Sequence, residues 1–530
     1  MKKGVLILNK PWQAFYPTGV PHEIAPAQYS IYQFLSNAAE QHPNKIAVKE
    51  NYHETTYAEL KRAVNKFAAA LYENGFKKGD MFAIMLPNCL EYVISFYAVQ
   101  RLGGTVVQVN PMYQQRELDY ILEDSGATWL ICNEFQKPKL KHIEHVICIF
   151  ADGANEDKQT LYTWINKAEN SPPSILVEVE NDIAILQYTG GTTGRSKGVM
   201  ITHQNVVCNI SQNMITSSDL NSWERVIGIA PMFHAMGLTI MNTTVYNGGT
   251  YYPIKRFELD SLVETIKDFQ PTIFSGSPTM FIALLNHPDV NSETLNSIKI
   301  FGSGSAPLSL EVMKAFEEKS ATPIIESYGL SEATTMTHKN PTDQRKVGSI
   351  GIPVPSTDAQ IVDMETGTKR LPIGEIGELI IKGPQIMKGY WRNKNETEKA
   401  LRNGWLYTGD LAYMDEDGFF YISGRKKDMI IAGGYNIYPM EIEEVLYKLP
   451  AVKEVCVYGI PDSYRGETVK AAIVLKDGMK LNESEIVNWC NENLARYKVP
   501  RVIEFKTELP KTAVGKILRT KLIEMETSKL

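Results

Sequence analysis

The sequence predicts an α/β protein with a large N-terminal domain of helix-covered sheets, a small β-rich subdomain and a small α+β C-terminal domain. Through roughly the first 350 residues, short apolar runs alternate with helical patterns, which is typical of parallel sheets covered by helices. From about 350 to 424 the helical patterns become rare, and a polar joint at 424–428 then precedes a mixed pattern. We therefore assign 1–424 to the N-terminal domain, about 350–424 of it to the β-rich subdomain, and 425–530 to the C-terminal domain.

Hydrophobic spacing predicts the individual elements. The N-terminal domain begins with predicted helices at about 30–42 and 57–74, and Gly75 marks the end of the second. Further strands are predicted at 81–85, 106–108, 128–132, 146–150, 226–229, 273–275 and 298–302, and further helices at 90–102, 115–125, 203–213 and 260–269. In the C-terminal domain we expect helices at 440–448 and 483–494 and strands at 452–460 and 470–475.

Composition is that of an ordinary globular protein. Hydrophobic residues make up 43% of the chain and charged residues 22%, with a net charge of −6, which argues against intrinsic disorder. No lysine- and arginine-dense segment is interleaved with aromatic residues, so no nucleic-acid partner is expected. The six cysteines include no Cys-x-x-Cys pair, which argues against a zinc site and a disulfide framework.

Two apolar segments bear on where in the cell the protein is found. The run near the N-terminus is too short for a signal peptide. The uncharged stretch 226–254 is interrupted by polar residues and by Gly248-Gly249, so it predicts buried core rather than a membrane span. We therefore expect a cytoplasmic protein without a transmembrane helix, while peripheral membrane contact and a homodimer stay open.

The most informative stretch is the glycine-rich loop Tyr188-Thr-Gly-Gly-Thr-Thr-Gly-Arg-Ser-Lys-Gly198. Apolar runs at 183–188 and 199–202 flank it, so it should join two strands. Glycines let backbone N–H groups face an anion, hydroxyls add donors, and Lys197 adds a compact positive charge. The loop therefore suits a phosphate site, although no register of it fits the strand-to-helix pattern Gly-x-x-x-x-Gly-Lys-Ser/Thr, and taken alone such a segment is more often a flexible surface loop.

Two further stretches carry suitable chemistry. Residues 326–334 combine an aromatic ring, a glycine, hydroxyls and a carboxylate, which suit adenine stacking and Mg²⁺, although this stretch alone reads as a turn after a strand ending at Ile325. Asp410 can accept hydrogen bonds from both ribose hydroxyls, and Arg425 offers a planar fork for the same sugar or a phosphate, although a surface aspartate and arginine could equally be solvated.

Together these stretches resemble the signatures of the adenylate-forming enzymes, the superfamily of acyl- and aryl-CoA synthetases, beetle luciferases and peptide-synthetase adenylation domains. The glycine-rich loop is similar to Thr-Ser/Gly-Gly-Thr-Thr-Gly-x-Pro-Lys-Gly, with Ser196 in place of proline. Residues 328–332 are similar to Tyr-Gly-x-Thr-Glu, with Ser331 in place of threonine. The segments 405–410, 424–428 and 510–516 are similar to Trp-x-x-Thr-Gly-Asp, Gly-Arg-x-x-Asp and Pro-x-x-x-x-Gly-Lys. The overall pattern is most like bacterial fatty acyl-CoA ligases.

The resemblance implies roles for particular residues. The implied ATP- or AMP-binding residues are Thr189, Gly190, Gly191, Thr192, Thr193, Gly194, Lys197, Gly304, Ser305, Ala306, Tyr328, Gly329, Ser331, Asp410 and Arg425. The implied catalytic residues are Lys516, His234 and Lys197, the implied Mg²⁺ ligand is Glu332, and the implied acyl pocket comprises His234, Met236, Gly304 and Ser305. Gly433, Gly434 and Tyr435 would border the pantetheine of CoA, and Lys427 would be the hinge of a mobile C-terminal domain.

The activity implied by the resemblance is that of an ATP-dependent acyl-CoA synthetase. A carboxylic acid, expected to be a medium- or long-chain fatty acid, would form acyl-AMP with release of pyrophosphate, and CoA would then displace AMP. Mg²⁺ would be the cofactor, and the acid, ATP and CoA would be the small-molecule substrates. The alternatives are an aryl-CoA ligase of the coumarate or benzoate type, an acyl-AMP ligase that loads a carrier protein, and a catalytically silent nucleotide- or lipid-binding homologue.

Overall fold

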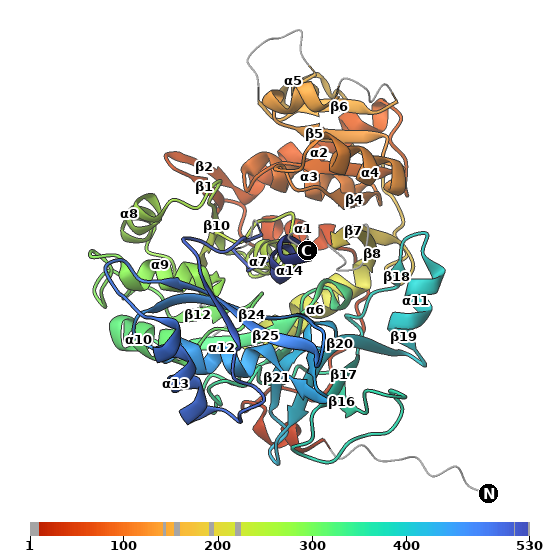
Figure 1. Cartoon of the computed structure of the whole chain (residues 1–530). Coiled ribbons are helices and arrows are strands. Elements are labelled where there is room, and N and C mark those ends of the chain that lie inside the picture. The colour runs from red at the N-terminus through yellow and green to blue at the C-terminus, as the bar shows by residue number, and fades with distance from the viewer. Residues whose placement is uncertain are drawn as a thin grey trace, which may run out of the picture.

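The computed structural model describes residues 10–140, 145–152, 159–189, 196–217, 224–512 and 515–527 (Figure 1). Within these ranges, two large mixed sheets and a smaller antiparallel sheet precede a fourth sheet that belongs to the C-terminal part of the chain. Figure 1 draws the elements of this C-terminal part in blue.

The first large sheet, which has seven strands in the described ranges, contains the strands on either side of the glycine-rich loop. Its order is β18 (Gly389–Tyr390), β8 (Lys197–Thr202), β7 (Ile183–Thr189), β4 (Thr105–Gln108), β3 (Met81–Met85), β5 (Trp129–Cys132) and β6 (Ile147–Phe150). The strands from β7 to β6 are parallel, whereas β7 and β8 are antiparallel. The prediction that the loop joins two strands is therefore confirmed.

The second large sheet has nine strands in the described part of the chain. Its order is β15 (Ile352–Pro353), β14 (Met336–Lys339), β13 (Ile324–Gly329), β12 (Ile300–Ser303), β11 (Ile273–Gly276), β9 (Arg225–Gly228), β10 (Thr250–Pro253), β1 (Ile46–Glu50) and β2 (His53–Thr56). The prediction of a turn directly after Ile325 was wrong, because β13 continues to Gly329. Antiparallel pairing with β14 holds the Ser327-to-Gly329 segment in the sheet.

Helices cover both large sheets, as the alternating pattern predicted. They are α1 (Tyr32–Gln41), α2 (Tyr57–Glu73), α3 (Leu90–Arg101), α4 (Gln115–Ser125), α5 (Leu161–Lys167), α6 (His203–Ile215), α7 (Ala235–Tyr246), α8 (Leu259–Phe269), α9 (Pro278–Asn286) and α10 (Leu310–Ser320). A capping box fixes the start of α2, where the Thr56 hydroxyl accepts from the backbone N–H of Glu59 and the Glu59 carboxylate accepts from that of Thr56.

Helix α7 lies in the uncharged stretch that was predicted to be core. It contacts α1, α6, β9 and β10, and Leu238, Met241 and Val245 are buried. A helix with neighbours on several sides needs no polar face, so its sequence shows no amphipathic periodicity. The core assignment of 226–254 is confirmed, and none of the helices in the described ranges has the length and hydropathy needed to span a bilayer.

The third sheet occupies much of the predicted β-rich stretch. It consists of β16 (Asp358–Val362), β17 (Gly377–Lys382), β20 (Trp405–Met414) and β19 (Leu401–Arg402), with β21 (Phe420–Arg425) paired to β20. The stretch from about 350 to 424 is not confined to this sheet, because β15 joins the second sheet and β18 joins the first. It also contains a short helix, α11 (Lys394–Ala400).

The C-terminal part forms its own sheet with flanking helices. The strand order is β23 (Tyr435–Ile437), β22 (Ile430–Ala432), β25 (Gly466–Leu475) and β24 (Val452–Asp462), and β26 (Val502–Phe505) pairs parallel with β25. Its helices are α12 (Pro439–Tyr447), α13 (Glu483–Asn493) and α14 (Arg519–Thr527). A single turn of 3-10 helix, Lys426–Asp428, connects β21 to this part, and α12 contacts β21.

Candidate active site

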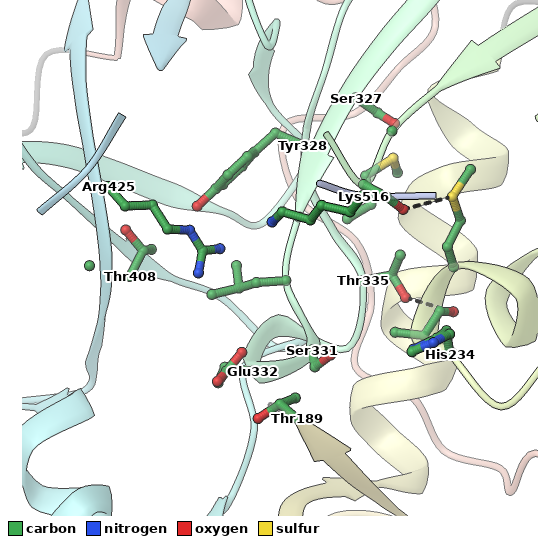
Figure 2. Close-up of a pocket in the computed structure, with 18 of the residues that line it drawn as sticks. Thr189, His234, Ser327, Tyr328, Ser331, Glu332, Thr335, Thr408, Arg425 and Lys516 are labelled. Atoms are coloured by element: carbon green, nitrogen blue, oxygen red, sulfur yellow. Dashed lines mark hydrogen bonds between the residues drawn. The ribbon is translucent and has the colours of Figure 1, made fainter. Parts of the chain in front are cut away.

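A cavity of about 910 Å³ collects residues from three of the sheets and from the C-terminal tail. Its lining includes Thr189, Lys197, Pro231, His234, Met236, Ser277, Met280, Gly304, Ser305, Tyr328, Gly329, Ser331, Glu332, Thr335, Met336, Tyr390, Glu396, Lys399, Thr408, Gly409, Arg425, Lys426, Lys427 and Lys516. Figure 2 shows ten of the lining residues with labels. A volume of this size is typical of small-molecule sites.

Lys516 enters the cavity on a tight loop of the C-terminal tail. The Thr512 hydroxyl accepts a hydrogen bond from the Lys516 backbone N–H at 3.1 Å, and the Thr512 N–H donates to the Lys516 carbonyl at 2.8 Å. The neighbouring Gly515 has φ +79°, and a Cβ there would lie 2.3 Å from the Thr279 hydroxyl oxygen, so only glycine permits this close approach to the N-terminal part. The loop is thereby seated against the start of α9.

The Lys516 side chain extends toward Tyr328 and Arg425 (Figure 2). Residue 516 is exposed to solvent through the open cavity, while the protein groups around it bury its ammonium from part of the water. This burial, reinforced by the positive charge of Arg425, lowers the pKa of Lys516 to about 8. The structure thus places an ammonium group of reduced pKa at the centre of the cavity.

The segments around Asp410 and Arg425 meet as cross-strand partners. Asp410 on β20 lies opposite Arg425 on β21, and the Arg425 Nε is 3.0 Å from the Asp410 carboxylate. The Tyr328 hydroxyl donates to the other carboxylate oxygen at 2.6 Å. Burial and the adjacent Asp410 raise the pKa of Tyr328 well above its usual value, so its hydroxyl stays protonated. Three residues from separate motifs therefore form one hydrogen-bonded group.

His234 and Met236 form the apolar end of the cavity. His234 precedes the first residue of α7, and burial lowers its pKa to about 4, so the imidazole is neutral at physiological pH. The Ser305 hydroxyl lies 3.3 Å from the Met236 sulfur. Met280 and Met336 also line this cavity. Methionine side chains adapt to ligands of different shape, which suits an apolar acyl group.

Lys197 lies at a polar end of the cavity, beside Tyr390 and Glu396. It forms an ion pair with Glu396, and its ammonium sits 5.1 Å from the centre of the Tyr390 ring. The Tyr390 hydroxyl donates to the Glu332 carboxylate at 2.8 Å. Figure 2 shows Glu332 grouped with Ser331 and Thr189, which brings hydroxyl oxygens to the same end. This polar end combines positive charge with oxygen ligands.

Most of the predicted site residues line this one cavity, but several do not. Gly190, Gly191, Thr192, Thr193 and Gly194 lie outside the described residues. Ala306 is absent from the lining, and Asp410, which is 4% exposed, reaches the cavity only through Tyr328 and Arg425.

The predicted CoA residues lie away from the cavity. Gly433 and Gly434 form the two-residue turn between β22 and β23, with φ +60° and +83°, and positive φ at both central positions favours glycine. Tyr435 stacks on Tyr497 at 4.5 Å between ring centres. By contrast Lys427, the predicted hinge, lines the cavity directly after Arg425 and Lys426.

Sequence reasoning missed several lining residues. Glu396 and Lys399 come from α11, a short exposed helix without a recognised motif, and Ser277 and Met280 come from the start of α9. Tyr390 was not among the predicted site residues, although pairing of β18 with β8 brings it next to Lys197. No signal in α11 itself points to the cavity, because its contact with Lys197 joins residues far apart in the chain.

A metal ion could be held at Glu332 only with help from a substrate. Among the residues with described positions, no group of three or more histidine, cysteine, aspartate and glutamate side chains could bind a metal alone. Mg²⁺, however, is usually bound by one or two carboxylates together with water and substrate phosphates. The Glu332 carboxylate, at the polar end of the cavity, fits this mode of Mg²⁺ binding.

Comparison with known proteins places this geometry in a family. The AMP-binding enzyme family matches residues 35–391, and the C-terminal domain of AMP-binding enzymes matches residues 441–516. The chain therefore belongs to the AMP-binding enzymes. The superfamily predicted from the sequence is confirmed.

Full-length relatives agree with this assignment. A long-chain-fatty-acid–CoA ligase of Bacillus subtilis (strain 168) is 44% identical over an alignment of 552 positions. This alignment covers 98% of each protein. The crystal structure of ATP-bound MatB from Rhodopseudomonas palustris matches with a TM-score of 0.87 at 30% identity, covering 94% of this chain and 99% of that one. An anthranilate CoA ligase in complex with anthranoyl-AMP matches with a TM-score of 0.88 at 29% identity, covering 96% and 99%. The predicted fold class is confirmed, and the relatives support an ATP-dependent acyl-CoA synthetase.

Proposed function

We propose that this protein is an AMP-forming acyl-CoA synthetase that activates a medium- or long-chain fatty acid. One observation carries the proposal: the Lys516 ammonium from the C-terminal tail lies in the same cavity as a polar end with Lys197 and Glu332 and an apolar end with His234. A carboxylate and a polyphosphate can therefore meet at one positively charged centre. ATP and CoA serve as co-substrates, and the cytoplasm, where both are available, is the proposed location.

In the first half-reaction the carboxylate attacks the α-phosphorus of ATP, and pyrophosphate leaves. The carboxylate is already a nucleophile, so the protein's task is to orient two anions and compensate their charge. In this proposal Lys516 would contact the carboxylate and the α-phosphate, and Lys197 would contact the outer phosphates; both lysines line the cavity. The imidazole of His234 stays neutral, so it adds no positive charge beside the carboxylate of the acid.

The nucleotide base and sugar are assigned to other lining residues of the same cavity. Gly304, Ser305 and Tyr328 line the cavity where adenine would pack, and Ser331 and Thr189 offer hydroxyls to phosphate. The ribose hydroxyls would be held at the Asp410 and Arg425 pair. The raised pKa of Arg425, which results chiefly from Asp410, keeps this guanidinium charged.

Mg²⁺ belongs to the proposal as the cofactor of the first half-reaction. Glu332 would hold it together with phosphate oxygens, and the hydrogen bond from Tyr390 fixes one carboxylate oxygen of Glu332. When bound, the ion would neutralise polyphosphate charge and polarise the phosphoryl oxygens.

The acid is proposed to be a fatty acid for two reasons. Met236, Met280 and Met336 line the cavity together with His234, and they offer an adaptable apolar surface to an acyl chain. The full-length relative that is 44% identical is a long-chain-fatty-acid–CoA ligase. An aryl-CoA ligase is the second candidate, because the anthranilate CoA ligase shares the fold closely.

A panel of acids tests this assignment. Each additional methylene that is buried should improve the specificity constant by up to about 0.8 kcal/mol until the pocket is full. CoA-dependent AMP formation should therefore rise from acetate through octanoate and then level off with longer chains. If benzoate or coumarate outperforms every alkyl acid, the fatty-acid assignment is wrong while the ligase assignment stands.

The reduced pKa of Lys516 predicts the pH dependence of the first half-reaction. Lys516 is charged below its pKa of about 8 and loses its proton above it, where the charge that the reaction needs is lost. The kcat/KM for ATP in acyl-AMP formation should thus fall about tenfold per pH unit above pH 8. Pyrophosphate release between pH 6 and about 10 measures this profile.

Charge-retaining variants identify the titrating group, because Arg425, Lys427, Asp410 and Asp428 also surround Lys516. Lys516→Arg should shift the alkaline decline upward by more than one pH unit, since a guanidinium stays protonated. Lys427→Arg is the matched control and should leave the decline near pH 8. A decline that persists unchanged in Lys516→Arg would contradict the assignment.

A further inference from the structure

A second carboxylate, Glu396, reaches the polar end of the cavity and has no place in the scheme above. Glu396 lies in the first turn of α11, where the Asn393 side chain accepts from its backbone N–H at 3.1 Å and fixes the start of the helix. Both Glu396 and Lys399 line the cavity. The negative charge of Glu396 therefore faces the space assigned to the polyphosphate.

Glu396 is bound to the lysine that the polyphosphate needs. Its carboxylate forms an ion pair with Lys197, and its other oxygen accepts from the Lys399 ammonium at 2.7 Å. The hydrogen bond from Lys197, followed by that from Lys399, lowers the pKa of Glu396 to about 2, so the carboxylate stays charged at every working pH. Glu396 thus sits between two lysines.

The ion pair is open enough to exchange partners. The side chains of Lys197 and Glu396 are 25% and 29% exposed, and ion pairs that remain in contact with water are weak. A polyphosphate offers Lys197 more charge and shorter charge-assisted hydrogen bonds than one carboxylate does. When Lys197 turns to phosphate, Lys399 remains beside Glu396 and keeps it from being left unpaired.

We propose that Glu396 competes with the polyphosphate for Lys197, and that it lowers the affinity of the cavity for ATP and for pyrophosphate. It is a positioning residue, because it acts through Lys197 and not on the reacting atoms. After the first half-reaction, return of Lys197 to Glu396 favours departure of pyrophosphate. This inference rests on the proposed function, since it assumes that the polar end binds phosphates.

Glu396→Gln tests the competition in the full-length protein. The amide keeps the shape of the side chain but removes the negative charge that holds Lys197. With Mg²⁺ present, calorimetry should show pyrophosphate and ATP binding about tenfold more tightly than to the wild type, equivalent to about 1.4 kcal/mol. Stopped-flow displacement should show correspondingly slower release of pyrophosphate. A purely structural role for Glu396 would not tighten binding.

Two variants provide the controls. Glu398→Gln removes a charge from the same helix at a side chain that is 64% exposed and pairs with Lys394, outside the cavity lining, and it should leave both affinities unchanged. In a Lys197→Met background, Glu396→Gln should tighten pyrophosphate binding by no more than about twofold, because the pair being tested is gone.

The outcomes separate this inference from the proposed function. Unchanged or weaker binding of pyrophosphate by Glu396→Gln would overturn the competition, while a wild type that still converts fatty acid to acyl-CoA keeps the proposed function. Equal tightening with and without Lys197 would also overturn it, because the effect would not pass through that lysine. A wild type that binds neither ATP nor pyrophosphate would overturn the proposed function and the inference together.

Discussion

Lys516→Ala is expected to slow acyl-AMP formation by about a hundredfold or more while leaving transfer of the acyl group from supplied acyl-AMP to CoA nearly intact. In the first step this ammonium must compensate two anions at the cavity centre, where preorganised charge contributes about 2.7–4 kcal/mol to the transition state. In the second step the pyrophosphate has gone and the attacking group is a thiol. Measuring pyrophosphate release and thioester formation separately distinguishes the two steps.

Lys521→Ala is the matched control for this substitution. Lys521 is an exposed lysine of the same C-terminal tail, on α14, and it does not line the cavity. Both half-reactions should therefore keep their wild-type rates. A Lys516→Ala enzyme that is equally slow in both half-reactions would contradict the division of labour between them.

Gly434→Leu is expected to have the opposite effect, with CoA transfer falling by about a hundredfold and acyl-AMP formation nearly unchanged. Gly434 lies in the turn between β22 and β23, away from the cavity, and a Cβ there would meet no atom within 4 Å. The side chain should therefore not disturb the arrangement that brings Lys516 into the cavity. If the C-terminal domain turns about Lys427 to bring this loop beside pantetheine, the leucine would obstruct the thiol, and small misplacements of reacting groups cost about this much.

Gly478→Leu is the control for the backbone strain that a leucine causes at a position of positive φ. Gly478 also has a positive φ, +76°, with no atom within 4 Å of a built Cβ, so both variants carry a similar strain of about 1–2 kcal/mol. Gly478→Leu should leave both half-reactions intact. Normal CoA transfer in a folded Gly434→Leu enzyme would remove this loop from the second step.

Local patterns predicted much of the fold. The helix at 115–125 and the strand at 81–85 match α4 and β3 residue for residue, because the apolar spacing of the helix and the apolar run of the strand are local to each segment. Helix α7 could not be found this way, since burial on several sides removes its periodicity. Strand β18 could not be assigned to the first sheet, because a two-residue strand carries no pattern that names its partner.

The residues of the candidate site could likewise be predicted only in part from local patterns. Motifs named Asp410 and Arg425 separately, but only the register of β20 and β21 shows that they lie opposite each other. The contact between Lys197 and Glu396 joins residues 199 positions apart, so no local signal could predict it. The lowered pKa of Lys516 depends on the walls of the cavity. The roles of Lys427, Gly433, Gly434 and Tyr435 in the second half-reaction stay predictions.

The pairing of β21 with β20 determines which site residues would move if the C-terminal domain rotated. Arg425 is the last residue held by that pairing, and Lys426 begins the single turn that leads away. A rotation that starts after Arg425 would withdraw Lys516 but leave Arg425, Asp410 and Tyr328 in place. The sugar of the acyl-adenylate would then stay tethered while its carbonyl becomes open to the thiol. A labile mixed anhydride could in this way wait for CoA without escaping into water, where hydrolysis would waste the ATP.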